Sequence, residues 1–366
     1  MAASIKVVAL LGTGLIGGSI GLGLRRLGMI VRGYDHDPTR RDEALTIGAA
    51  DETGDSVPEL VDGVDLVVVA VPVGRIAEVV VGALDAGAPV VTDVGSVKAP
   101  IVAEVETARP ELGGRFVGGH PMTGSEQSGL TGADADLFAG ATWVLTPTGR
   151  TDASAFASVG ALVGRLGSEV IATTPERHDE LVAVVSHVPQ LAATTLMDMA
   201  AETGEGHATL LRLAAGGFRD MTRIAAGDAE IWPDICIANR DAIVAGLDNY
   251  LAALDEVRSL VVDGDRGRLL SVLERARDAR RNLPVGAPSG EKLAEVRVPV
   301  PDRPGVIAEV TTLAGAMGVN ITDVEIAHSV EGGGGVLMLV VAARAAERLA
   351  SALTERGYHT GWTELP

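Results

Sequence analysis

The sequence predicts three consecutive regions: a doubly wound α/β sheet, an all-helical region, and a small α+β unit of ferredoxin-like topology. Short Val, Ile and Leu runs alternate with helix-like segments from residue 5 to about 174, the pattern of a parallel sheet with helices on both faces. After Pro175 such runs almost vanish, and Ala- and Leu-rich helical periodicity replaces them. Strand and helix patterns return in the order β-α-β-β-α-β over residues 291–366.

The strands predicted for the first region are mostly uninterrupted apolar runs, as expected of strands buried on both faces. They lie at residues 6–11, 30–35, 65–71, 89–94, 115–119, 142–147 and 169–174. A stretch rich in proline and glycine at 284–290 is typical of a linker. The predicted domains are therefore 1–174, 175–285 and 291–366.

Composition narrows the class of protein and of partner. The formal charge is -19 at pH 7, whereas nucleic acid and anionic membrane surfaces attract basic patches. We therefore expect neither as a partner and expect a soluble cytoplasmic protein, since the sequence also shows no signal peptide and no apolar run of transmembrane length. Cys236 is the only cysteine, which excludes an internal disulfide.

A glycine-rich motif follows the first predicted strand and opens a helix. Gly12, Gly14 and Gly17 form the G-x-G-x-x-G pattern of Rossmann-like domains that bind dinucleotides. The first glycine permits a tight turn, the second lets the backbone approach a pyrophosphate, and the third allows the helix to pack closely on the strand. The phosphates would then lie at the positive end of the helix.

Asp35 ends the second predicted strand, near the spacing at which an acidic residue bonds the adenosine ribose 2′-OH. A carboxylate there would repel a 2′-phosphate, so we expect NAD as cofactor. The alternative is an aspartate that only makes a turn or a cap. NADP remains open as an alternative cofactor because three arginines lie nearby in the sequence: Arg32, Arg40 and Arg41.

The stretch VGGHPMTGSE holds a single histidine, His120, between Gly118–Gly119 and Pro121. Glycine suits unusual backbone angles, and proline fixes its own φ and pushes the preceding residue toward extended geometry. We therefore predict that His120 lies in a rigid loop, neither helix nor ordinary strand, at the carboxyl edge of the sheet beside the nicotinamide. Histidine is the side chain best suited to move a proton at neutral pH. The alternative is a solvated surface histidine.

Ser96, in DVGSVK, follows another predicted strand and reaches the same edge. We expect it near the nicotinamide. A second, compatible role is N-cap of a helix that starts at Val97 or Lys98.

Five motifs in this order resemble the prephenate and arogenate dehydrogenases of tyrosine biosynthesis: GLIGGSIG, DVGSVK, GGHPMTGSEQSG, VVSHVPQ and GGFRDMTRIAAGDAEIW. The resemblance covers about residues 5–280, and the last unit resembles an ACT domain through DRPGVIAEV and GVNITDVEI. It implies NAD-dependent oxidative decarboxylation of prephenate to 4-hydroxyphenylpyruvate. His120 would accept the proton of the C4 hydroxyl, and Ser96 would orient it.

The resemblance also implies the contacts to the substrate, a dianion that needs cations. Arg223 would bind a carboxylate bidentately, positioned by an ion pair with Asp220 three residues earlier on a helix. His187 would contact the substrate side chain, and Trp232 would form an apolar wall against the ring. The other implied contacts are Ser125, Gly216 and Arg219 for the substrate, and Leu15, Ile16, Val71 and Pro72 for the cofactor.

Each of these contacts has a structural alternative. The arginines can be a solvated helix face, Trp232 a core residue, and His187 a helix histidine beside a kink at Pro189. Some family members carry a second histidine where this chain has Gln190, so arogenate remains open as the substrate. No histidine shows metal-ligand spacing, and no metal is assigned.

The resemblance further implies a homodimer formed by the helical region, whose Ala- and Leu-rich helices have more apolar surface than one small core can bury. It implies L-tyrosine as a ligand and inhibitor at the ACT unit, with phenylalanine as the weaker candidate. Gly305 would give backbone access, and Asn320 would offer both donor and acceptor to an amino acid. The alternative is that both residues only make turns.

Two other functional classes fit parts of the pattern. A β-hydroxyacid dehydrogenase also joins a Rossmann domain to a helical one, but it needs a catalytic lysine there, and no lysine lies between Lys98 and Lys292. An amino-acid sensor would use the last unit alone and would not need Ser96, His120 and Arg223 together. A prephenate or arogenate dehydrogenase is therefore favoured.

Overall fold

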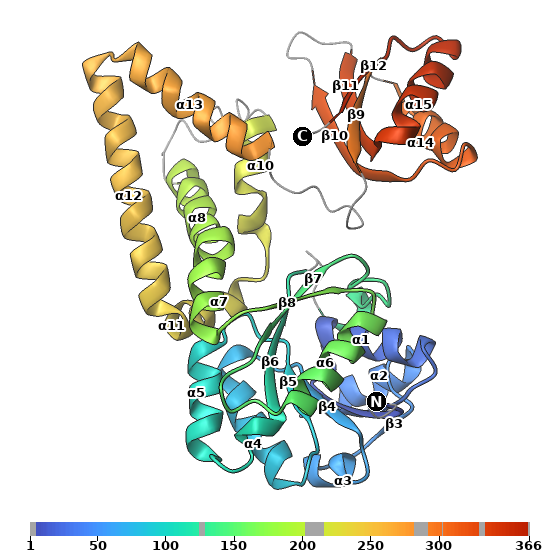
Figure 1. Ribbon diagram of the computed structural model, residues 1–366, viewed down its shortest axis with the longest axis vertical. Coiled ribbons are helices and arrows are strands. Elements are labelled where there is room, and N and C mark those ends of the chain that lie inside the picture. The colour runs from blue at the N-terminus through green and yellow to red at the C-terminus, as the bar shows by residue number, and fades with distance from the viewer. Residues whose placement is uncertain are drawn as a thin grey trace. The chain divides into compact units, whose positions relative to one another are not determined.

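The computed structural model describes residues 5–123, 129–201, 216–281, 292–301, 303–328 and 334–364. The chain divides into two compact units, Met1–Leu254 and Asp255–Pro366, whose elements are labelled in Figure 1. The predicted linker at 284–290 and the predicted substrate contact Ser125 lie outside the described residues.

The first unit contains an eight-stranded sheet of order β3-β2-β1-β4-β5-β6-β7-β8. Each strand predicted for this region is present. The bounds are β1 Val7–Leu11, β2 Ile30–Tyr34, β3 Glu52–Thr53, β4 Leu66–Val69, β5 Val91–Asp93, β6 Phe116–Pro121, β7 Thr142–Thr146 and β8 Glu169–Ala172. The prediction missed β3, because two residues are too short to form an apolar run.

The predicted parallel sheet has one antiparallel neighbour pair, since β7 pairs antiparallel with β6. Neighbouring parallel strands need a crossover connection, usually a helix. In the described part of the segment between β6 and β7, the only helical element is the short 3₁₀ turn Leu130–Gly132. The chain therefore returns beside β6 in the opposite direction, and β8 then runs parallel to β7.

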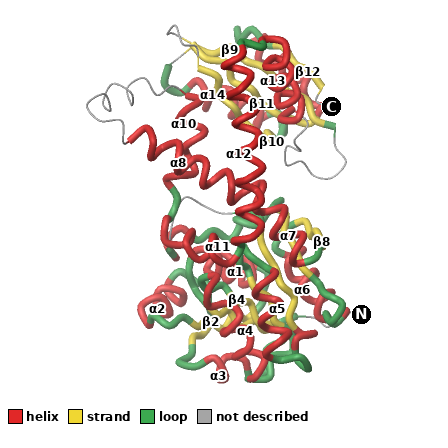
Figure 2. Tube along the Cα trace, turned by 90° about the vertical axis from the view of Figure 1, so that its left-hand side faces the viewer, coloured by secondary structure: helices red, strands yellow, loops and turns green. Residues whose placement is uncertain are grey.

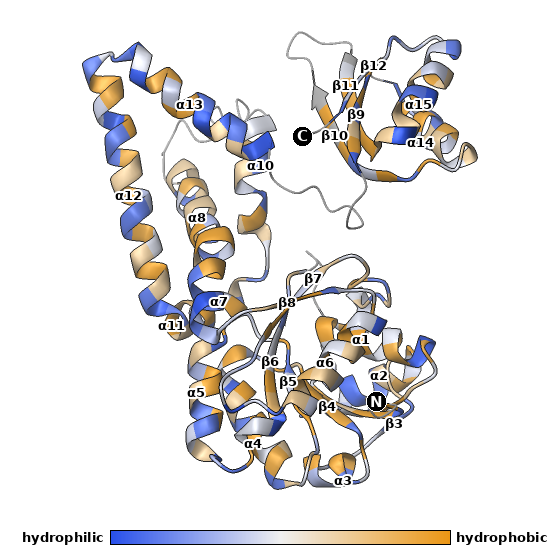
Figure 3. Ribbon diagram, in the orientation of Figure 1, coloured by the Kyte–Doolittle hydropathy of each residue, from blue (hydrophilic) through white to orange (hydrophobic). Residues whose placement is uncertain are grey.

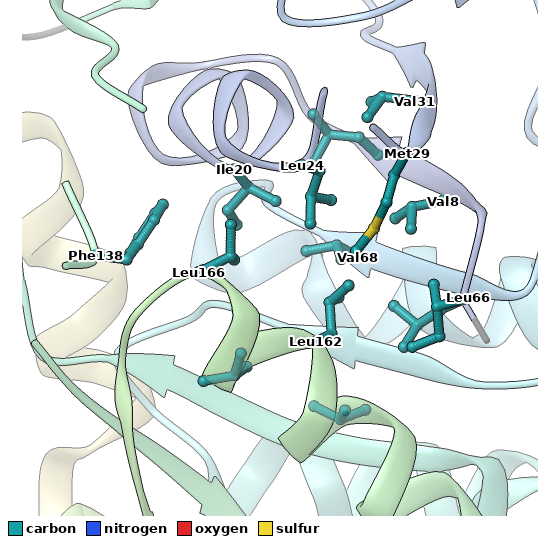
Figure 4. Close-up of a cluster of buried hydrophobic side chains, with 14 of the residues drawn as sticks. Val8, Ile20, Leu24, Met29, Val31, Leu66, Val68, Phe138, Leu162 and Leu166 are labelled. Carbon is teal, nitrogen blue, oxygen red and sulfur yellow. The ribbon is translucent and has the colours of Figure 1, made fainter. Parts of the chain in front are cut away.

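Helices cover both faces of this sheet, as two separate apolar clusters show. On β1, Val8 and Leu10 pack into one cluster with Ile20 of α1, while Ala9 and Leu11 pack into the other with Val80 of α4. Figure 4 shows the first cluster. The helices of this region are α1 Leu15–Arg26, α2 Pro38–Thr46, α3 Val57–Val61, α4 Ile76–Asp85, α5 Ala99–Ala108 and α6 Ala153–Arg165.

The region after Pro175 is helical, as predicted. One continuous run begins with α7 Pro175–Val182, widens into a π-helical turn at Ala183–His187, and continues as α8 Val188–Ala201. The π turn directly precedes Pro189, where the sequence predicts a kink. The later helices are α10 Gly216–Thr222, α11 Trp232–Ala238, α12 Arg240–Asp263 and α13 Arg266–Arg281. Among the described helices, drawn in red in Figure 2, none combines the length and apolar character needed to cross a bilayer.

The last part of the second unit, from Leu293 to Glu364, has the predicted β-α-β-β-α-β order around its own core and is called the C-terminal unit below. Its elements are β9 Leu293–Pro301, α14 Val306–Ala316, β10 Ile321–His328, β11 Gly334–Ala342, α15 Ala343–Glu355 and β12 Gly361–Glu364. The sheet order is β10-β11-β9-β12, and all neighbours are antiparallel. Alternate residues of β9, such as Val296 and Val298, pack against Leu349 and Leu353 of α15.

Candidate active site

The three glycines of the turn between β1 and α1 have different structural roles. Gly12 has φ +100°, and a Cβ there would lie 2.3 Å from the Ala70 carbonyl oxygen. A Cβ on Gly17 would lie 2.0 Å from the Gly12 carbonyl oxygen, so the turn and the helix approach as only glycine allows. Gly14, at the N-terminus of α1, has no atom within 4 Å of such a Cβ. That open position, in a helix without acidic residues in its first turn, suits an anionic phosphate.

Asp35 lies directly after β2 and is buried, with 4% of its surface exposed. It accepts hydrogen bonds from the Thr13 backbone N–H (3.0 Å) and hydroxyl (3.3 Å), and from the Asp37 N–H at 3.0 Å. The carboxylate thus joins the end of β2 to the glycine-rich turn. It has the position predicted for a ribose contact and also makes a turn.

The other cofactor contacts implied by the sequence lie at the same carboxyl edge. Leu15 and Ile16 are the first residues of α1 and are half-buried. Val71 and Pro72 follow β4, and the Val71 side chain lies 3.1 Å from a Cβ built on Gly12. The ends of β1, β2 and β4 therefore form one edge, as a dinucleotide site requires.

His120 does not lie in an irregular loop, contrary to the sequence prediction. It belongs to β6, which continues to Pro121, and it pairs with Val144 of β7. Neither adjacent glycine has a positive φ. They are required by close neighbours instead, since a Cβ on Gly118 would lie 2.5 Å from the Thr146 hydroxyl and one on Gly119 2.7 Å from the Asp93 carbonyl oxygen. The rigidity expected of this position comes from strand pairing.

A chain of side chains extends from His120 into the helical region. His120 Nδ1 lies 2.9 Å from His178 Nε2, and His178 Nδ1 lies 2.7 Å from Asp179 Oδ1. His120 is half-buried, while His178 and Asp179 are buried. The Asp179 carboxylate also accepts from the backbone N–H groups of Lys98 and Ala99, each at 2.8 Å.

These bonds overturn one role considered for Ser96. Helix α5 begins at Ala99 with Lys98 as its N-cap residue, and Asp179 of α7 satisfies its first N–H groups. Ser96 does not cap the helix. It is half-buried at the carboxyl edge, and its hydroxyl makes no hydrogen bond within the part of the chain that the structure describes.

A buried ion pair lies beside β6. Lys98, fully buried, bonds the Asp93 carboxylate and donates to the Gly119 carbonyl oxygen at 2.9 Å. Asp93 in turn accepts from the Gly119 N–H at 3.1 Å. Burial lowers the pKa of Lys98, and Asp93 opposes that shift. The pair holds both polar backbone groups of the residue next to His120.

The surroundings of His120 disfavour its protonated form. Desolvation lowers its pKa well below the ordinary value, and the nearby His178, Lys98 and His187 lower it further. The imidazole is therefore neutral at physiological pH.

His187 and Trp232 come together although they are far apart in the sequence. Their ring centroids lie 6.0 Å apart in an edge-on arrangement. His187, 1% exposed, faces the Asn239 amide nitrogen through Nδ1 at 3.1 Å, and its Nε2 is buried without a partner among the described residues. Desolvation lowers the pKa of His187 to about 4.

The predicted cation site on α10 differs from expectation. Helix α10 begins at Gly216 and ends at Thr222, and Arg223 opens a 3₁₀ turn, so Asp220 and Arg223 do not lie on one α-helix. No ion pair joins these two residues in the described structure, and Arg219, Asp220 and Arg223 are all exposed. The expected positioning of Arg223 by Asp220 is therefore wrong.

The two predicted regulatory residues lie at opposite ends of the C-terminal sheet. Gly305, with φ +89°, precedes α14 just after β9 ends at Pro301, while the exposed Asn320 directly precedes β10. Both Ile321 and Ala294 pair with Val341, so β10 starts level with the beginning of β9. One amino acid cannot contact both residues within a single unit.

Four residues of the site carry no role in the sequence analysis: Lys98, His178, Asp179 and Asn239. Lys98 lies within DVGSVK, and the buried charge pair it forms with Asp93 could have been suspected from their five-residue spacing. His178 and Asp179 are adjacent at the start of the helical region, and that pairing of a base with a carboxylate was the available signal. Asn239 gave none.

A Rossmann-like sheet with an open phosphate position at a helix N-terminus, and a neutral histidine at the same edge, define an NAD-dependent oxidoreductase. Comparison with known proteins specifies the family. The chain matches the family models of the prephenate dehydrogenase nucleotide-binding domain over residues 20–172, the prephenate dehydrogenase dimerization domain over 174–275, and the ACT domain over 294–357. It belongs to the prephenate dehydrogenase family.

Individual relatives agree with this assignment. A prephenate dehydrogenase of Bacillus subtilis is 33% identical over 338 residues, which cover 91% of both chains. The crystal structure of Aquifex aeolicus prephenate dehydrogenase with hydroxyphenyl propionate and NAD⁺ is 31% identical, with a TM-score of 0.71 over 78% of this chain and 100% of that one. Synechocystis arogenate dehydrogenase is 29% identical, with a TM-score of 0.66 over 75% of this chain and 99% of that one.

Proposed function

We propose that this protein catalyses the oxidative decarboxylation of prephenate to 4-hydroxyphenylpyruvate. In this reaction C4 loses a hydride, the C4 hydroxyl loses its proton, and the C–C bond to the ring carboxylate breaks to release CO₂. The electron pair of that bond enters the ring, which becomes aromatic, and the phenolate oxygen recovers a proton. The observation that carries the proposal is the neutral, desolvated His120 on a paired strand at the cofactor edge.

His120 acts as the base for the C4 hydroxyl. A neutral imidazole can accept the hydroxyl proton and later return it to the phenolate. Strand pairing on one side and the His178 contact on the other hold the ring in place. That rigidity matters because a misplacement of about 1 Å can cost on the order of 100-fold in rate. Ser96, whose hydroxyl is unpaired in the described structure, is available at this edge to orient the reacting groups.

The edge formed by β1, β2 and β4 fits a dinucleotide. Gly14 leaves room for a pyrophosphate at the N-terminus of α1, and Asp35 offers a carboxylate toward a ribose. NAD⁺, when bound, supplies the hydride acceptor. Asp35 favours NAD⁺ over NADP⁺ because a buried carboxylate disfavours a 2′-phosphate.

The helical region supplies the substrate contacts. The buried His187 and the half-buried Trp232 form a pair that suits the ring and the pyruvyl side chain of the substrate. Arg223 and Arg219 lie exposed near Gly216, where they can meet the carboxylates of a dianion. Ser125 is retained as a proposed contact.

One experiment tests the function and chooses between the two substrates. NADH formation is followed with purified protein and either prephenate or arogenate. Prephenate is expected to be turned over with the higher kcat/KM. A higher kcat/KM for arogenate would instead make this protein an arogenate dehydrogenase, like the Synechocystis relative. If neither substrate gives NADH, the proposal is refuted.

A homodimer is also proposed, formed by the helical region. An apolar cavity of about 550 Å³ lies between α8, α10 and α12, lined by residues such as Val188, Ala192, Met221 and Tyr250. Helix α12 carries exposed apolar side chains, among them Leu251 and Val244. Orange, hydrophobic segments alternate with blue ones along this helix in Figure 3. Such a surface is typical of a subunit interface. Sedimentation as a monomer at micromolar concentration would contradict it.

L-Tyrosine is proposed as the ligand of the ACT unit. Because Gly305 and Asn320 lie at opposite ends of the sheet, a tyrosine that contacts both must bind between two paired units. The test compares inhibition of the full chain with inhibition of a truncation ending near Pro288. Loss of inhibition in an active truncation is expected, whereas unchanged affinity for tyrosine would exclude the unit as the sensor.

A further inference from the structure

We propose that Asp179 and Asn239 give the two histidines of the site opposite hydrogen-bonding roles toward the substrate, so that His120 presents an acceptor to it and His187 presents a donor. This inference rests on the proposed function and names the positioning residues for that site. It follows from four hydrogen bonds. Chemistry fixes the donor and the acceptor in three of them, and the fourth, between His178 and His120, is fixed when His178 carries a single proton.

The first constraint acts on His120 through His178. Both oxygens of the Asp179 carboxylate accept a backbone N–H bond at the start of α5, so this group also acts as the acceptor toward His178. His178 Nδ1, 2.7 Å from this carboxylate, must therefore carry a proton. In a neutral His178 the lone pair is then on Nε2, which accepts from His120 Nδ1 at 2.9 Å. The remaining nitrogen of His120, Nε2, holds a lone pair and is free to take a substrate proton.

The second constraint acts on His187 through Asn239. The Asn239 side-chain nitrogen lies 2.9 Å from the Asp179 backbone carbonyl oxygen, which can only accept, so the amide must present its NH₂ group there. The other hydrogen of the same NH₂ group points to His187 Nδ1 at 3.1 Å. His187 Nδ1 must then be unprotonated, and the proton of the neutral ring is on Nε2.

With its proton on Nε2, His187 has a buried hydrogen-bond donor that is left without an acceptor. His187 is 1% exposed, and its Nε2 has no hydrogen-bond partner among the described residues. A buried donor without an acceptor is unfavourable, because it has given up its hydrogen bond to water. A keto or carboxylate oxygen of the substrate side chain is the acceptor that would satisfy it. The ring stays neutral while it donates, because desolvation lowers the pKa of His187 to about 4.

Asp179 is the shared element of the two arrangements. Its side chain acts on His120 through His178, and its backbone carbonyl acts on His187 through Asn239. When His120 takes up a proton, the positive charge can be stabilised by the His178–Asp179 pair, as in other histidine–carboxylate pairs. Asp179 thereby assigns His120 the role of base and His187 the role of donor to the substrate.

Nitrogen-15 NMR of the imidazole rings tests the inference directly and independently of turnover. Spectra of the full-length protein without substrate are assigned with the single variants His120→Asn and His187→Asn. We expect the proton of His120 on Nδ1 and that of His187 on Nε2. The opposite tautomer at either ring, or a doubly protonated His178 that donates to His120, would overturn the proposal even if prephenate is the substrate.

Kinetics supply a second test, because the two positioning residues should affect different constants. Asn239→Asp replaces the donor with an acceptor and should raise the KM for prephenate at least 10-fold with kcat within about threefold of wild type. His178→Phe should lower kcat at least 10-fold with KM nearly unchanged, and His178→Gln, whose carbonyl can accept from His120, should recover part of it. Parallel changes in kcat and KM in both variants, with no rescue by glutamine, would indicate a merely structural role.

Discussion

His120 differs in exposure from Arg219 and Arg223, the two arginines proposed for the substrate carboxylates, because His120 is half-buried and both arginines are exposed. Around His120, strand pairing, the Lys98–Asp93 pair and the His178–Asp179 pair hold every neighbouring element in place. On α10 and the turn that follows, Arg219 and Arg223 are exposed. The groups proposed for proton transfer are therefore preorganised, whereas the cations proposed for the carboxylates are exposed to solvent.

Replacing His120 should have the largest effect, because it removes the base from the preorganised region. His120→Asn keeps a polar group but cannot take up the hydroxyl proton, so kcat should fall by about 100- to 10,000-fold while NAD⁺ affinity is retained. Steady-state kinetics and NAD⁺ titration measure the two quantities. A near-normal kcat would show that the preorganised residues around His120 do not carry the chemistry.

The second test concerns the buried pair behind β6. Lys98→Met leaves the Asp93 carboxylate buried without its partner, and stability should fall by roughly 3–5 kcal/mol. The shift of the urea transition measures the loss. Lys292→Met, at an exposed position, is the matched control and should change stability by no more than about 0.5 kcal/mol. If the double variant Asp93→Asn with Lys98→Met is no more stable than the single one, the cost does not come from the unpaired charge.

The third test concerns the exposed region. Arg223→Ala should raise the KM for prephenate by about 10- to 100-fold, as expected when a carboxylate loses a charged hydrogen-bonding partner, with little effect on the KM for NAD⁺. Arg258→Ala, an exposed arginine on α12, serves as the control. An unchanged KM would exclude Arg223 from substrate binding.

The smallest expected effect is on the pH dependence of stability. The pKa of His187 is about 4 in the folded chain and about 6.5 when unfolded. Between these values the unfolded chain binds more protons, so the free energy of unfolding falls as pH decreases through this window. His187→Leu should make that decline shallower, and exposed His359→Leu serves as the control. Equal slopes in both variants would show that His187 is not protonated on unfolding.

Much of the fold could be predicted because its signals are local. Apolar runs located each strand of the first sheet except the two-residue β3, and the β-α-β-β-α-β pattern located the C-terminal unit. The glycine motif placed the open turn at α1, since the need for a positive φ at Gly12 is itself local. The prediction of a loop at His120 was wrong because Gly118 and Gly119 are required by close packing against Thr146 of β7 and Asp93 of β5. Both neighbours lie on other strands and are distant in the sequence.

The sequence by itself determined which segments become strands and helices, where the dinucleotide turn lies, and that His120 reaches the carboxyl edge, because periodicity and turn chemistry act over a few residues. Only the tertiary structure decided the antiparallel direction of β7 and the partners of the site. His120 meets His178 across 58 residues, and the Lys98 N–H meets Asp179 across 81. Such contacts depend on how helices and strands pack once they have formed. The local sequence around one residue does not predict which distant residue packing will bring next to it.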